Sequence, residues 1–130
     1  MSGEFMIGLD RLEQAVLDKL LAKDHPVLVA LREQATSARL ARREYTGVGF
    51  HCHFDVGEGA PTVKKDFHIG DVRAEMEGVA HGIGFVLIIR DGRLSMLEGY
   101  TYDEPWPSEI RGFTLRYAEA GRRSELAKLG

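Results

Sequence analysis

The sequence predicts a single α+β domain, with two N-terminal helices packed on one face of a mostly antiparallel four- to five-stranded sheet. Three observations favour this fold class. Apolar residues recur at helical spacing in the first third of the chain and at every second position afterwards. The dipeptide Asp91-Gly92 separates two strand-like runs, as in a β-hairpin. The length of 130 residues suits one domain.

Two helices are expected before residue 44. The first, over residues 10–23, opens with Asp10 and Glu13 at the spacing of a capping box. Pro26 follows a break in the pattern, and proline suits the first turn of a helix because its missing N–H would be unpaired there. A second helix is therefore predicted from Pro26 to about Arg43.

Strands are expected in the rest of the chain. Residues 48–56 alternate, which places Cys52 on the core side with the phenylalanines and turns His51 and His53 to the other face. Residues 72–79 alternate in the same way. Residues 83–89 are apolar nearly throughout, which favours a central strand. A last strand is predicted at residues 113–117.

The Asp91-Gly92 turn predicts the register of the hairpin. In a regular ladder Glu98 lies opposite Phe85, and its side chain points toward the core. A buried carboxylate without a partner is costly. Glu98 is therefore expected to be a structural carboxylate with a satisfied hydrogen bond, and the alternative is a catalytic acid or base, for which it is the candidate residue.

The two outward histidines suggest a metal site. His51 and His53 bind one ion together if Glu75 or Glu77 comes from a neighbouring strand, since two imidazoles and a carboxylate are a ligand set for zinc or non-haem iron. The alternative is charge pairing between strands on a solvated face. Both readings stay open at this point.

Composition and termini limit the remaining possibilities. Basic residues number 17 and acidic residues 20, so no nucleic-acid partner is expected. No apolar run approaches the roughly 20 residues that cross a bilayer, which predicts no membrane association. The single cysteine fits the cytoplasm, and no cofactor is expected because cofactor motifs are missing from the sequence.

Domain boundaries follow from the ends of the chain. Residues 1–5, Met-Ser-Gly-Glu-Phe, are typical of a cloning scar, and residues 6–120 are expected to form the domain. Residues 121–130 form a C-terminal tail, frayed or weakly helical.

A binding surface is predicted on the sheet face turned away from the helices. Its candidate residues are Val86, Ile88 and Leu97, together with Trp106 in a proline-rich loop. We therefore expect a homodimer or a protein partner. The functional prediction is a non-enzymatic binding or accessory protein, immunity-like or regulatory. The alternative is a metal-dependent or carboxylate-based small-molecule enzyme.

Two segments carry a resemblance to a known family. They are Arg43-Glu-Tyr-Thr-Gly-Val-Gly-Phe50 and Leu97-Glu-Gly-Tyr-Thr-Tyr-Asp-Glu-Pro-Trp-Pro107. These segments resemble those of a family of small bacterial proteins with no assigned activity. The resemblance covers residues 43–110 and implies a shared sheet, but no site residue.

Overall fold

The computed structural model describes residues 6–118 and 121–129. The predicted cloning scar therefore lies outside the described residues. The elements in chain order are α1 (Arg11–Leu20), α2 (Pro26–Ser37), β1 (Arg39–Tyr45), β2 (Gly49–Asp55), β3 (Phe67–Ile69), β4 (Val72–Met76), β5 (Ile83–Arg90), β6 (Arg93–Thr101), β7 (Phe113–Tyr117) and α3 (Gly121–Ala127). The predicted α+β class and antiparallel sheet are confirmed. The strand count is a correction, because the sheet has seven strands rather than four or five.

The sheet is one antiparallel layer with the order β1-β2-β6-β5-β4-β7, and β3 also pairs with β5. The short strand β3 pairs with the second half of β5, while β4 pairs with its first two residues. On its other edge β4 pairs along its whole length with β7, whereas only Arg73 and Ala74 of β4 pair with β5. The β4–β5 hairpin is therefore splayed, and the gap contributes to the groove described below.

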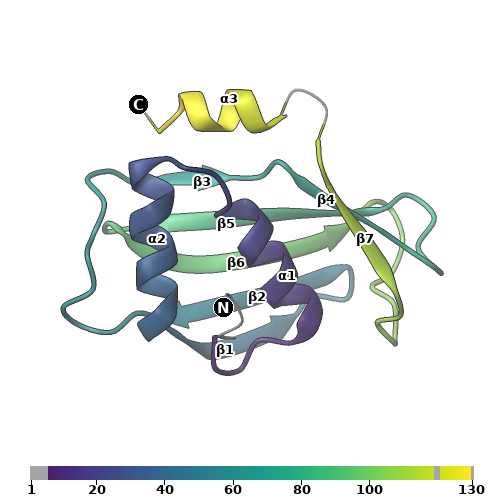
Figure 1. Ribbon diagram of the computed structural model, residues 1–130. Helices are drawn as coiled ribbons and strands as arrows, with labels where there is room; N and C mark the ends of the chain where they lie inside the picture. Colours follow the sequence, from purple (N-terminus) through teal and green to yellow (C-terminus); the bar gives the residue numbers. More distant parts are fainter. Residues whose placement is uncertain (1–5, 119–120, 130) are drawn as a thin grey trace.

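Helices α1 and α2 lie on one side of this layer (Figure 1). The capping box predicted for α1 is present, with Asp10 and Glu13 each accepting a backbone N–H of the other. Proline begins α2, as predicted. Both helices turn leucines and valines into the core, where they meet the inward side chains of the central strands. The fully buried core includes Leu12, Val16, Leu20, Leu28, Leu31, Cys52, Phe85 and Leu87.

The second helix is shorter than predicted, which is a correction. It ends at Ser37, and residues 39–45 form β1 instead. The Leu-Ala-Arg-Arg-Glu run of β1 consists of good helix formers. Pairing with β2 along the whole strand outweighs that local preference. Arg43 of β1 also binds Glu13 of α1, which is almost fully buried, through Nε at 2.8 Å from Oε2.

The register of the hairpin is a second correction. Ile89 pairs with Leu94, as a regular ladder from the Asp91-Gly92 turn requires, but Ile88 pairs with Met96, so Ser95 is an extra residue in β6. The bulge reverses the face of every following residue. Leu97 is consequently fully buried, and Glu98 lies on the opposite face. The bulge therefore keeps the Glu98 carboxylate out of the core, where its burial would be costly.

Two buried polar groups tie distant segments together. Gln34 of α2 donates to the carbonyls of Pro61 and Gly92, at 2.7 and 2.8 Å, and accepts the Leu94 N–H at 2.9 Å. Asp71, between β3 and β4, binds Arg122 of α3 through both carboxylate oxygens, with Nε 3.0 Å from Oδ2 and Nη2 3.0 Å from Oδ1.

The C-terminal segment set apart in the sequence analysis contains α3. Its Leu126 packs against the core, and Leu129 after it is buried. Among the described residues, none of the helices has the length and apolar character to cross a membrane.

Candidate functional site on the open sheet face

The sheet has one face that no described helix covers, opposite α1 and α2 (Figure 1). We call it the open face. Its centre is formed by half-buried side chains of β5 and β6, among which Val86, Ile88 and Met96 are apolar. Val86 and Ile88 were predicted here. Met96 and Tyr100 were missed, because the bulge that brings them to this face was not predicted.

Histidines and carboxylates gather at one end of the open face. Glu44, His51 and Glu98 lie in one row across β1, β2 and β6. The Nε2 atom of His53 is 2.8 Å from Glu44 Oε1, and that of His51 is 3.3 Å from Glu98 Oε2. One ligand atom each from Glu44, His51 and His53 lies within 4.8 Å of the other two. We call Glu44, His51, His53 and Glu98 the imidazole–carboxylate cluster.

The electrostatics of this cluster follow from its neighbours. The hydrogen bond from His53 lowers the pKa of Glu44, and Arg42 lowers it further. Arg42 Nη2 lies 3.2 Å from His53 Nε2 and 3.6 Å from Glu44 Oε1. The Arg42 side chain is 63% exposed. The lowered pKa favours the ionised carboxylate, and the cation that balances its charge is an exposed surface side chain.

The carboxylates predicted to complete a metal site lie elsewhere. Glu75 and Glu77 belong to β4 and the turn after it, and two strands separate β4 from β2. Glu75 instead pairs with Arg116 of β7 at 3.5 Å, and Glu77 with Arg111 at 3.7 Å. The structure brings Glu44 to the histidines in their place. Glu44 was not predicted as a ligand because residues 39–43 were predicted to continue the second helix and not to form a strand beside the histidines.

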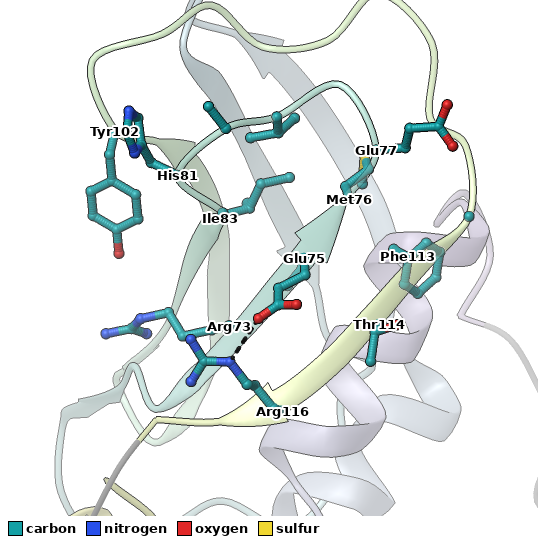
Figure 2. Close-up of a pocket in the computed structure, with 15 residues that line it drawn as sticks. Arg73, Glu75, Met76, Glu77, His81, Ile83, Tyr102, Phe113, Thr114 and Arg116 are labelled. Carbon is teal, nitrogen blue, oxygen red and sulfur yellow. Dashed lines mark ion pairs between the residues drawn. The ribbon is translucent and has the colours of Figure 1, made fainter.

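A groove of about 790 Å³ opens at the other end of the open face. Arg73 of β4 and Arg116 of β7 are directly opposite one another in the ladder, with Glu75 beside them. Figure 2 shows these three side chains together, and His81 and Tyr102 further along the groove. Like charges directly opposite in a sheet are unfavourable. Arg73, Arg116 and Glu75 together carry an excess of one positive charge, while Glu77, which also lines the groove, is paired with Arg111.

Tyr100 connects the apolar centre with the groove. Its ring lies over Gly84, where a Cβ atom would sit 2.5 Å from Tyr100 Cζ. It also meets Tyr102 edge to face, with centroids 5.5 Å apart. Burial raises the pKa of Tyr100, and the hydrogen bond with Tyr102 adds to this. A glycine at position 84 therefore lets the aromatic ring lie flat on the sheet.

Two residues of the predicted binding surface do not reach the open face. Leu97 is in the core because of the bulge. The ring of Trp106 packs edge-on against Phe50, with ring centroids 5.3 Å apart, and the main-chain N–H of Trp106 donates to the Gly47 carbonyl at 2.9 Å. Phe50 is buried on the helix side of the sheet, so Trp106 closes one end of the core.

Cys52 takes no part in the open face. It is fully buried on the core side, as predicted, while its neighbours His51 and His53 face outward. Burial raises the pKa of the Cys52 thiol. A nucleophilic thiolate beside either histidine is therefore disfavoured.

Comparisons with protein-family models, with curated proteins and with solved structures give no match to this chain. The resemblance to small bacterial proteins stays a prediction.

Proposed function

We propose that the protein is a non-enzymatic binding or accessory protein of the bacterial cytoplasm, regulatory or immunity-like, that acts through the open face. One observation carries this proposal. Val86, Ile88 and Met96 form an apolar patch at the centre of a sheet face over which no described helix lies. Contiguous apolar surface of this kind, with polar residues around it, is typical of interaction sites.

The occupant that we propose is a second copy of the chain. The imidazole–carboxylate cluster carries two carboxylates, Glu44 and Glu98, beside one guanidinium, Arg42, which is a local excess of one negative charge. The strands β4 and β7 carry the excess positive charge of Arg73 and Arg116. The imidazole–carboxylate cluster and the Arg73–Arg116 pair are thus of opposite local charge.

A twofold axis uses this complementarity. We place the axis in the interface, parallel to the strands and between β5 and β6. The strand order β1-β2-β6-β5-β4-β7 of one protomer then runs in the opposite direction across the partner. The outer strand β1 of one protomer then lies over β7 of its partner, and Glu44 approaches Arg116. The apolar centres stack on each other, as in two packed sheets.

The required area is available. A standard interface covers roughly 800 Å² on each partner. The accessible surface of the chain is 7436 Å², so such an interface takes about a tenth of it. A sheet face that spans six adjacent strands provides this area.

The test is the oligomeric state of metal-free protein over a wide range of concentration, measured by sedimentation or light scattering. We expect a dimer, and Ile88→Glu should raise its Kd by at least about 30-fold, because a central interface side chain contributes about 2 kcal/mol. Val29→Glu is the matched control, since Val29 is exposed on α2, away from the open face. Circular dichroism checks that both variants fold.

A charge exchange tests the symmetry. Glu44→Arg and Arg116→Glu should each weaken the dimer, and the double variant should restore it. A wild-type chain that stays monomeric, or a dimer that Ile88→Glu leaves intact, would refute the proposal.

A further inference from the structure

We infer that Glu44, His51 and His53 bind one divalent transition-metal ion of the zinc class on the open face. This inference goes beyond the proposed dimer, because all three ligands come from a single chain. It also differs from the site expected from sequence, since the carboxylate comes from β1 and not from β4.

The backbone brings the three ligands together. His51 and His53 are two positions apart on β2, so their side chains leave the same face of the sheet. Glu44 lies opposite His51 in the β1–β2 ladder, and its carboxylate reaches the neighbouring His53. The ladder thus fixes the Cα positions of all three ligands before any ion arrives.

The distances suit one ion after small side-chain rotations. Tetrahedral zinc with bonds of about 2.0–2.1 Å places its ligand atoms roughly 3.3–3.5 Å apart. The ligand atoms of the three residues are within 4.8 Å of one another, and the His53–Glu44 pair is at 2.8 Å. The side chains are about one-third to one-half exposed, so rotation that brings the atoms to equal spacing meets little resistance.

The donor types select the class of ion. Two imidazole nitrogens and one carboxylate oxygen favour zinc and similar first-row ions over magnesium and calcium, which prefer oxygen alone. Three protein ligands leave a position for water or a further oxygen. Glu98 is an additional carboxylate beside these ligands, with Oε2 3.3 Å from His51 Nε2, and its charge adds to the attraction for a cation.

Arg42 occupies the position of the competing cation. Its guanidinium lies 3.2 Å from His53 Nε2 and 3.6 Å from Glu44 Oε1, so it must move when the ion binds. The high exposure of Arg42 makes this movement easy. Replacing Arg42 with glutamine should therefore tighten metal binding. A purely structural role for the cluster gives no reason for this gain.

The experiment titrates purified, tag-free and metal-stripped full-length chain with Zn²⁺ by calorimetry and with Co²⁺ by visible absorption. We expect one equivalent per chain, with the intense Co²⁺ bands of a four-coordinate site. His51→Ala and His53→Ala should each weaken binding by roughly 100-fold or more, exceeding the 10–100-fold loss typical of outer-shell changes. Arg42→Gln should strengthen it several-fold.

Two further variants complete the design. His68→Ala removes another exposed imidazole from the same face, on β3, and should leave binding unchanged. Ile88→Glu should retain one equivalent even if it abolishes the dimer, which separates this inference from the proposed function. Absence of stoichiometric binding by the wild type, or binding that His53→Ala does not reduce, would overturn the inference.

Discussion

Arg122 offers the sharpest test of how the C-terminal helix is held. Its guanidinium binds Asp71, with Nε at 3.0 Å from Oδ2, and donates to the last carbonyls of α1, at Leu20 and Lys19. It also lies over the Tyr117 ring, 4.3 Å from the centroid. The side chains of Arg122 and Asp71 are only 11% and 1% exposed. One side chain thus joins α3 to α1, to the β3–β4 junction and to β7.

Arg122→Ala leaves Asp71 buried without its cation. Breaking a buried pair in this way costs about 3–5 kcal/mol, a large part of the 5–15 kcal/mol that stabilise a typical domain. The melting temperature should fall on the order of 10–20 °C. Urea unfolding followed by circular dichroism measures the loss. The control is Arg123→Ala, because Arg123 is exposed and should change stability by no more than about 0.5 kcal/mol.

The pH dependence of the loss checks its cause. Burial raises the pKa of Asp71, and removal of Arg122 should raise it further. A carboxyl with a raised folded pKa stabilises the fold below its unfolded pKa, and this contribution disappears as the pH rises through the folded pKa. The deficit of Arg122→Ala should therefore be larger at about pH 7 than at about pH 4. A loss below about 1 kcal/mol, or one independent of pH, would refute the reasoning.

Two other predictions concern the open face and the bulge behind it. Leu97→Ala should cost about 2–5 kcal/mol in urea unfolding, whereas Glu98→Ala should cost under about 1 kcal/mol; the reverse order would mean that the hairpin has no bulge. Glu44 has a lowered pKa because of His53, so its contribution to stability is present above its unfolded pKa and is lost as the pH falls through the folded pKa. His53→Ala should raise that pKa toward its ordinary value, and an unchanged NMR titration of the Glu44 carboxyl would contradict this.

The fold class could be predicted from sequence because the patterns are local. The capping box at Asp10, the proline that opens α2 and the alternation around Cys52 each depend on neighbouring residues only, and all three are confirmed. Residues 39–45 resisted prediction because their preference is helical and their strand pairing comes from a partner beyond the next turn. The three-residue β3 is too short to show a period.

Only part of the candidate site could be predicted, because only part of it depends on a local pattern. The outward direction of His51 and His53 follows from a two-residue period within one strand. The identity of their carboxylate neighbours depends on strand order, which no local pattern contains. The face of Glu98 was predicted wrongly, because the turn residues determine only the first pairs of a hairpin. One extra residue, Ser95, moves each later side chain of β6 to the opposite face.

The amide of Gln34 has a consequence for how the domain assembles. It forms hydrogen bonds with three main-chain groups, the carbonyls of Pro61 and Gly92 and the N–H of Leu94, which lie 27 to 60 residues further along the chain. The Gly92 carbonyl also accepts the Val63 N–H, but the Leu94 N–H gains the Gln34 side chain as its acceptor only when α2 docks. The hairpin tip and the helix therefore stabilise each other. The Leu94 amide proton should accordingly exchange with solvent only when the whole molecule opens, and it should report global rather than local fluctuation.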